Sequence, residues 1–208
     1  MMNPLKSIGG TLVSGLILAV IIVFATKGNH MFLGNAAGAV IIWLHVLAGI
    51  TWIGLLYYFN FVQVPALGDA VSDDGGPGGA GITKYVAPRA LWWFRWGAAL
   101  TWISGAAFLM HPGAPATLGE VFMLGMGGEA PNPYALTIGV GAWLGTFMLF
   151  NVWVLIWPNQ KKILGMVEAS ADEIAKAKNI AFLASRSNTL MSIPLVMSMI
   201  GAHHGWFM

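Results

Sequence analysis

Histidines are the residues of this sequence best suited to chemistry, and three of the five lie in apolar surroundings. His45 lies inside the run IIWLHVLAGITWIG, and His203 and His204 lie near the end of another apolar run. A neutral imidazole can bind a metal through one ring nitrogen while the other nitrogen makes a hydrogen bond. His30 and His111 fall in predicted loop or interface positions, and His111 precedes a proline, which favours the end of a helix.

The absence of cysteine narrows the kind of redox site that these histidines can form. Without cysteine, the 208 residues cannot hold a covalent haem through C-x-x-C-H, a thiolate metal site or a cysteine-bound iron–sulfur cluster. Two imidazoles from facing helices can ligate one haem b, so we expect His45 and either His203 or His204 to bind its iron. Neighbouring residues point about 100° apart around a helix, so only one of the pair can face a given iron. The alternative is that His45 hydrogen-bonds a neighbouring helix.

The composition predicts the surroundings in which these residues must be positioned. Hydrophobic residues make up 57% of the chain and charged residues 9%, whereas soluble domains carry about 25% charged residues. We therefore predict an all-α integral membrane protein, one domain over residues 1–208, with a bundle of about five transmembrane helices. The predicted spans are 9–26, 35–64, 91–110, 134–157 and 189–207. A separate amphipathic helix at 171–185, on the cytoplasmic surface, is expected to start at the S-x-x-E capping box of Ser170.

Basic residues predict the orientation of these spans. They gather before the first span and in the connections after the second and fourth: Lys6, Lys84, Arg89, Lys161, Lys162, Lys176, Lys178 and Arg186. Cytoplasmic loops are enriched in Lys and Arg, so we expect a cytoplasmic N-terminus and a C-terminus on the opposite side. His45, His203 and His204 then lie in the outer half of the membrane. The formal net charge of +2 gives no reason to expect a nucleic-acid partner.

A second polar set is predicted in the inner half of the bundle. Asn60, Arg95, Asn151 and Asn188 lie in or beside apolar helices. We interpret the asparagines as interhelical hydrogen-bonding residues and prefer this to a transport path. Arg95 lies close enough to its helix end to extend its guanidinium to the interface. The G-x-x-x-G at 141–145 predicts a close-packing face, either inside the bundle or toward a partner.

Four blocks of the sequence resemble, in order, the membrane domain of the bacterial membrane-bound urate hydroxylases, the urate oxidase N-terminal domain family. They are WLHVLAGITWIG (43–54), KYVAPRALWWFRWGAALTWISG (84–105), GAWLGTFMLFNVWVLIWPNQKK (141–162) and RSNTLMSIPLVMSMIGAHH (186–204). The resemblance implies a multi-pass protein of the bacterial inner membrane that oxidises urate to 5-hydroxyisourate and passes electrons to cytochrome c. The family histidines that match are His45 and either His203 or His204.

The sequence also departs from the family. Positions that hold histidine in the family hold Ala90–Leu91 and Val140 here, the segment between the third and fourth spans is shorter, and an extra span precedes the resemblance. We expect the C-terminal cytochrome c domain of the family to be missing, since the 208 residues contain no cysteine.

Three functions are compatible with these observations. The first is a membrane-embedded redox protein that binds haem b near the periplasmic face and passes electrons to a cytochrome c. The second is a urate-oxidising enzyme with a separate cytochrome c, in which the loop 112–133, with Glu120 and Glu129, forms a lid or docking patch. The third is a non-catalytic accessory subunit of a larger membrane complex. Expected partners are membrane lipid and a periplasmic cytochrome c or other membrane subunits, and an oligomer is compatible with all three.

Overall fold

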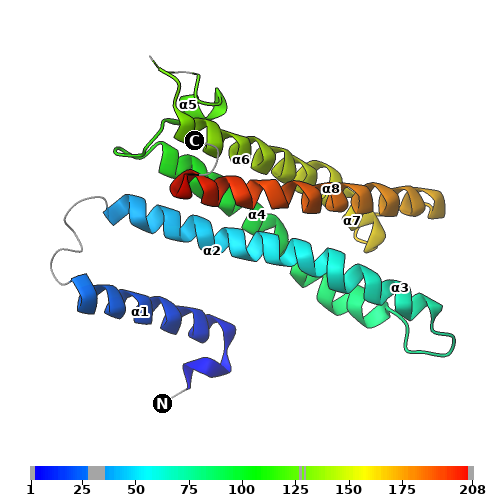
Figure 1. The fold of residues 1–208 in the computed structure, drawn as a ribbon. Coiled ribbons are helices and arrows are strands. Elements are labelled where there is room, and N and C mark those ends of the chain that lie inside the picture. The colour runs from blue at the N-terminus through cyan, green and yellow to red at the C-terminus, as the bar shows by residue number, and fades with distance from the viewer. Residues whose placement is uncertain (1–2, 28–35, 127, 129, 206–208) are drawn as a thin grey trace. The chain divides into compact units, whose positions relative to one another are not determined.

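The computed structural model describes residues 3–27, 36–126, 128 and 130–205, and within these ranges the regular elements are helices. The chain divides into two compact units, Met1–Val40 and Ile41–Met208, each described by itself. In the first unit, a short 3₁₀ turn, η1 (Pro4–Lys6), leads into α1 (Ile8–Lys27) (Figure 1). α1 is apolar enough to cross a membrane over Ile8–Thr26.

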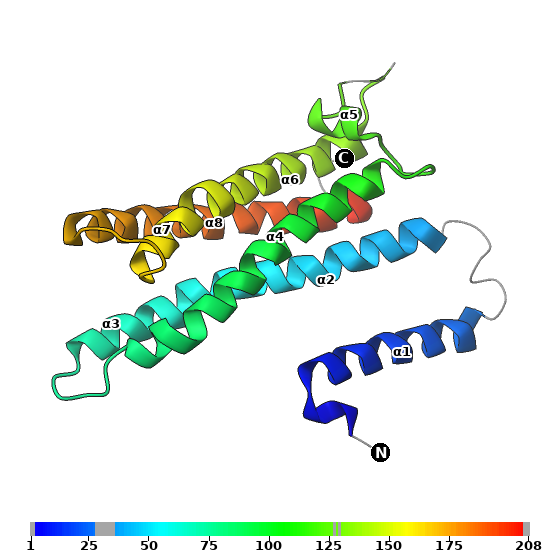
Figure 2. The same cartoon turned by 180° about the vertical axis from the view of Figure 1, so that it is seen from behind.

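The second unit is a bundle of long helices joined at two opposite ends. The helices are α2 (Ala36–Tyr58), which begins in the first unit, α3 (Val64–Ser72), α4 (Ala87–Leu109), α5 (Leu118–Phe122), α6 (Pro133–Phe150), α7 (Trp157–Ile163) and α8 (Ala171–His204). Figure 2 shows the α3–α4 and α7–α8 connections at one end, and α5 with the C-terminal end of α8 at the other. Lys84, Arg89, Lys161 and Lys162 belong to the first of these ends, here called the basic end.

Three π-helical turns extend the bundle helices past proline. These turns are η3 (Phe59–Gln63), η4 (Ile82–Val86) and η5 (Asn151–Ile156), and each precedes a proline by two residues: Pro65, Pro88 and Pro158. A proline lacks the N–H for the carbonyl four residues back, and its ring would strike that carbonyl. In all three cases that carbonyl lies inside the wider π turn, so the helix continues.

These turns make two helices longer than the sequence predicts. The helix predicted at 35–64 runs from Ala36 to Ser72, and the helix predicted at 134–157 runs from Pro133 to Ile163. Asn35 lies outside the described residues. The prediction of an all-α protein with membrane-spanning helices is confirmed, since four helices in the described ranges are long and apolar enough to cross a membrane. α4 forms where predicted but is not among the four, in line with its two arginines and four tryptophans.

The predicted break between a surface helix at 171–185 and a span at 189–207 is wrong. α8 runs without interruption from Ala171 to His204, and residues 206–208 lie outside the described part. The capping box of Ser170 and Glu173 is confirmed at its start. The segment between the two predicted helices is polar but has no glycine or proline. Its side chains bond to neighbouring helices, as when Ser185 accepts a hydrogen bond from Asn60.

Close packing in the core depends on the glycines of α6, which face inside the bundle. A Cβ on Gly141 would lie 2.9 Å from Ser198 Oγ, and one on Gly145 would lie 3.5 Å from Leu195. The Ser198 hydroxyl accepts the Gly141 N–H at 3.0 Å and donates to the Thr137 carbonyl. Ser198 therefore joins α8 directly to the backbone of α6.

Candidate functional site

His45 lies at the contact between α2 and α4, where its ring is held by the backbone of α4. Its Nδ1 lies 2.8 Å from the carbonyl oxygen of Thr101 and 3.4 Å from Ser104 Oγ. A carbonyl oxygen can only accept, so Nδ1 must carry the proton and donate. The other ring nitrogen, Nε2, then has its lone pair available. Metal-binding histidines commonly have this arrangement, in which the second nitrogen donates to a carbonyl that fixes the ring.

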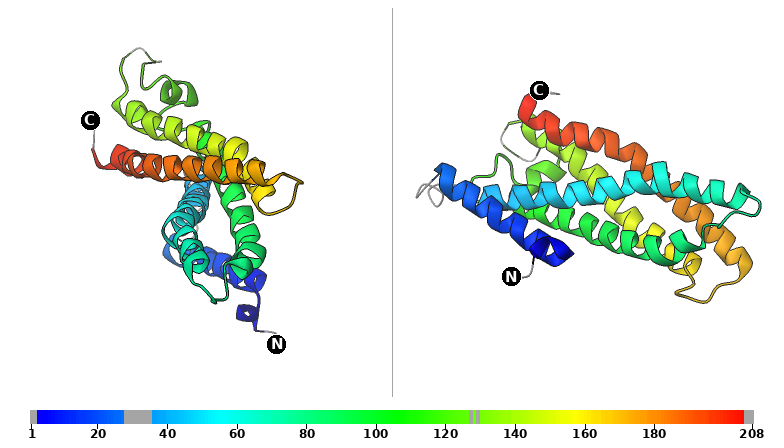
Figure 3. Two further views of the ribbon diagram at one scale, coloured as in Figure 1. Left: turned by 90° about the vertical axis from the view of Figure 1, so that its right-hand side faces the viewer. Right: turned by 90° about the horizontal axis from the view of Figure 1, so that it is seen from below.

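Gly105 provides the space for this ring. A Cβ at Gly105 would lie 3.0 Å from Cε1 and 3.1 Å from Nδ1 of His45. These distances are shorter than ordinary van der Waals contacts, so a side chain at this position would displace the imidazole. α2 and α4 run alongside each other here (Figure 3), and the bare backbone of Gly105 lets the ring lie against α4.

Trp52 adds a buried donor without an acceptor on the same side of α2. It lies seven residues after His45, which places the two on one helix face. The indole is 2% exposed, and its Nε1–H has no hydrogen-bond partner within the described part of the chain. Leaving such a group unpaired costs about 1–3 kcal/mol. An acceptor supplied by a bound group or by water would remove that cost.

The structure does not bring the other predicted ligands against His45. His203 and His204 are exposed near the end of α8, and the His203 ring packs edge-on against Tyr134 of α6, with centroids 5.6 Å apart. Among the described residues, no hydrogen bond or ring contact joins either imidazole to His45. His30 lies outside the described residues. His111 follows α4, as predicted for a helix end, and its Nδ1 is buried without a partner in the described part.

The predicted inner polar set forms a hydrogen-bonded group across three helical segments. Asn188 of α8 is fully buried; its Nδ2 donates to the Met148 carbonyl at 3.0 Å, and its Oδ1 accepts from Asn151 at 2.8 Å. Asn60 of η3 donates to Ser185 Oγ and to the Leu56 carbonyl, both at 2.8 Å. These amides join η3, α8 and the α6–η5 helix. Their geometry is suited to packing.

Arg95 is arranged differently from the asparagines. Its guanidinium carbon lies 3.4 Å from the ring centroid of Trp157 and 5.9 Å from that of Trp153. Its Nε is buried and has no hydrogen-bond partner among the described residues. Arg95 therefore makes cation–π contacts, while its hydrogen-bonding capacity is left open.

Glu120 has a local role in the loop between α4 and α6. It forms a capping box with Thr117 at the start of α5, with its carboxylate 2.8 Å from both the N–H and the hydroxyl of Thr117. The Thr117 backbone hydrogen bond, followed by its side-chain bond, lowers the pKa of this carboxyl below its ordinary value. Glu129, the other predicted acidic residue of this loop, lies outside the described residues.

The fit of a haem at this place can be judged from His45 and Trp52. His45 carries its ring proton on Nδ1, as one axial ligand requires, and the Trp52 N–H has no partner among the described residues. The residues therefore fit one side of a haem site, and the second ligand stays a prediction. Sequence reasoning missed Gly105, Thr101 and Trp52. The spacing of seven residues from His45 was a usable signal for Trp52, whereas Gly105 is one glycine among 27.

Comparison with known proteins gives one result for the C-terminal part of the chain. Residues 132–208 match the family model described as Urate oxidase N-terminal. The match covers α6 to α8, and with them Asn151, Asn188 and the two adjacent histidines, but it does not extend to His45. No curated protein and no solved structure shows a detectable similarity to the chain.

Proposed function

From the membership of the urate oxidase N-terminal family that residues 132–208 support, we propose that this chain is a membrane-embedded redox protein related to urate oxidation. It binds haem b near the periplasmic face of the bacterial inner membrane and passes electrons to a cytochrome c. His45 is one axial ligand, and the sequence alone assigns the other to His203 or His204, since no described contact joins either ring to His45. The N-terminus lies in the cytoplasm.

The observation that carries this proposal is the hydrogen bond from His45 Nδ1 to the Thr101 carbonyl. It supports a tautomer whose Nε2 can donate its lone pair to iron. The same hydrogen bond joins α2 to α4, as the alternative interpretation of His45 predicts, and the haem proposal adds a partner at Nε2. The Gly105 backbone limits rotation of the ring and holds that lone pair in one direction.

A bound haem supplies one-electron redox chemistry, and the residues of this chain tune it. The Thr101 carbonyl raises the ligand strength of His45 by accepting a hydrogen bond from Nδ1–H. Trp52 offers a hydrogen-bond donor from the same face of α2. Trp52 packs in an apolar core with Leu56, Phe94 and Met148, all almost fully buried.

The test is the optical spectrum of the purified chain in detergent. We expect a reduced-minus-oxidised haem b spectrum, which His45→Ala abolishes and Gly105→Ala weakens or shifts. Gly54→Ala is the matched control, because a Cβ there meets nothing within 4 Å. A His203→Ala/His204→Ala double variant tests the second ligand. Absence of bound haem after haem supply, or a spectrum unchanged by His45→Ala, overturns the proposal.

The family match favours a second candidate, oxidation of urate to 5-hydroxyisourate by this chain with a separate cytochrome c. It predicts urate-dependent reduction of added ferricytochrome c, lost in His45→Ala. Haem binding with electron transfer to cytochrome c but no response to urate would leave the first candidate alone. Copurification with other subunits and no haem would instead indicate the accessory role.

A further inference from the structure

At the basic end of the bundle, Arg95 and Lys161 both lie near the ring of Trp157. Arg95 of α4 lies 3.4 Å from the Trp157 ring centroid, and Lys161 of α7 lies 5.9 Å from the same centroid. Within the described residues, neither cation has a carboxylate partner, and the ion pair at this end joins Lys162 to Glu173 at 3.4 Å. An anion that reached these two cations would compensate their charge.

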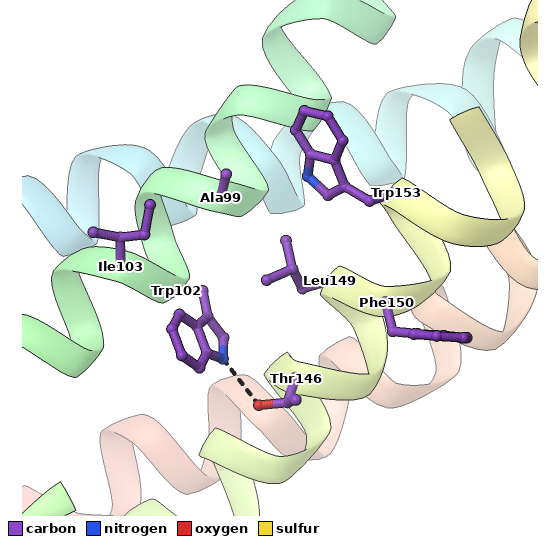
Figure 4. Close-up of a pocket in the computed structure, with 7 residues that line it drawn as sticks. All are labelled: Ala99, Trp102, Ile103, Thr146, Leu149, Phe150 and Trp153. Atoms are coloured by element: carbon purple, nitrogen blue, oxygen red, sulfur yellow. Dashed lines mark hydrogen bonds between the residues drawn. The ribbon is translucent and has the colours of Figure 1, made fainter. Parts of the chain in front are cut away.

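An apolar groove begins beside this charged pair. It has a volume of about 350 Å³, and Figure 4 shows it between α4 on one side and the α6–η5 helix on the other. Trp153 lies at one end, and the hydrogen bond from Trp102 Nε1 to Thr146 Oγ1, 2.9 Å long, lies at the other. The remaining lining residues are apolar: Ala99, Ile103, Leu149 and Phe150.

The charged pair and the groove are continuous. The ring centroid of Trp153 lies 5.9 Å from the guanidinium carbon of Arg95, and Trp153 also lines the groove. Ala99 follows Arg95 by one helical turn, and Ile103 follows by two, so the groove extends about 12 Å along α4 from the cation. A ligand that fits both parts has an anionic head and a long apolar tail.

We propose that this groove binds one anionic phospholipid, with its phosphate at Arg95 and Lys161 and one acyl chain along α4 and α6. The open hydrogen-bonding capacity of Arg95 suits a phosphate, which accepts charge-assisted bonds. The groove gives a chain apolar walls and no polar group except the Thr146–Trp102 pair, which is already bonded. A small polar anion such as urate could bond Arg95 but would leave the apolar length of the groove unfilled. A neutral lipid would leave the two cations uncompensated.

The test uses the full chain, delipidated in neutral detergent and titrated with phosphatidylglycerol, phosphatidylcholine or inorganic phosphate. Lipid adducts in native mass spectra and the melting temperature are the measurements. We expect phosphatidylglycerol to bind about tenfold more tightly than phosphatidylcholine. Arg95→Gln should remove most of that preference, and Arg95→Lys should restore part of it.

Arg89→Gln is the matched control, because it removes the same charge from α4 at an exposed site where Arg89 bonds only the Tyr85 carbonyl of the preceding turn. It should change phosphatidylglycerol binding by less than about twofold, because water screens an exposed charge that lies outside the groove. Ala99→Leu fills the groove without altering charge and should weaken phosphatidylglycerol binding about threefold. Ala107→Leu, on the same helix outside the groove, should leave it unchanged.

Three results would overturn the proposal. Equal binding of the two phospholipids removes the role of charge. Equal effects of Arg95→Gln and Arg89→Gln, with both variants folded by circular dichroism, remove the role of this arginine. Displacement of phosphatidylglycerol by inorganic phosphate or by urate would assign the cations to a small anion. None of these outcomes depends on haem binding, so the proposed function is tested separately.

Discussion

Polar groups are buried at two helix contacts, α6 with α8 and α2 with α4. Their hydrogen bonding differs between the two contacts. Between α6 and α8, the Ser198 hydroxyl both accepts and donates, and both ends of the Asn188 amide are used. Between α2 and α4, His45 uses one ring nitrogen, and the Trp52 N–H has no partner in the described part.

This difference distinguishes polar groups that only join helices from polar groups that could also bind a ligand. In an apolar environment an unpaired polar group is costly, so a fully paired set is sufficient for packing. The α2–α4 contact leaves the buried Trp52 N–H without a partner among the described residues, and the hydrogen bond of His45 uses only one of its ring nitrogens. The α6–α8 contact therefore needs no further partner, and the α2–α4 contact is where we propose that a ligand binds.

The largest expected effect comes from breaking the paired contact at its centre. Asn188→Ala removes the hydrogen bonds to Met148 and Asn151 and leaves a cavity, so we expect a loss of about 2 kcal/mol in the free energy of unfolding. Asn159→Ala is the control, because that amide donates only to the Leu155 carbonyl of its own helix. Denaturant unfolding in mixed micelles, followed by circular dichroism, measures both. Equal losses would contradict the structural role of Asn188.

A smaller loss should follow from widening the same contact. Gly141→Ala places a Cβ 2.9 Å from Ser198 Oγ, which its two hydrogen bonds hold in place. We expect a loss of about 1–2 kcal/mol in the same unfolding measurement. Gly54→Ala should be neutral or stabilising, because its Cβ meets nothing within 4 Å and alanine favours a helix. A neutral Gly141→Ala would mean that α6 and α8 separate easily.

These contacts also show how far the sequence could be used to predict the structure. Apolar runs long enough to span a membrane predicted the helices, and the polar residues inside them predicted which side chains bond between helices. Helix ends at Pro65 and Pro158 were misjudged because a π turn carries the helix past the proline. The break in α8 was misjudged because Ser185 and Asn188 resemble helix-end residues but bond neighbouring helices. Gly105 could not be predicted, because its role depends on which helix faces His45.

Trp52→Phe tests the contact between α2 and α4, where the Trp52 N–H has no partner among the described residues. Removing a buried N–H that has no described partner should stabilise the fold, whereas losing apolar volume should destabilise it. Without a cofactor, the free energy of unfolding should therefore change by less than about 1 kcal/mol. Haem retention in detergent should fall in the same variant. Trp102→Phe is the control, because its N–H is already bonded to Thr146 and its loss should destabilise the fold without affecting haem. Equal haem retention in the two variants would contradict a role for Trp52.

The smallest expected effect on stability comes from a change at Glu120, which lies outside both contacts. This effect depends on pH. Its pKa is lowered in the folded chain by hydrogen bonds from Thr117, so the folded state favours the ionised carboxylate. A lowered pKa gives stability that is fully present above the unfolded value, about 4.3, and is lost as pH falls through the folded value. Glu120→Gln should therefore lower the melting temperature slightly at neutral pH and have no effect well below pH 4. Because Glu120 is partly exposed, water screens this contribution, and the shift should be smaller than for any change at Asn188. A melting temperature difference that grew as the pH fell would contradict the capping role.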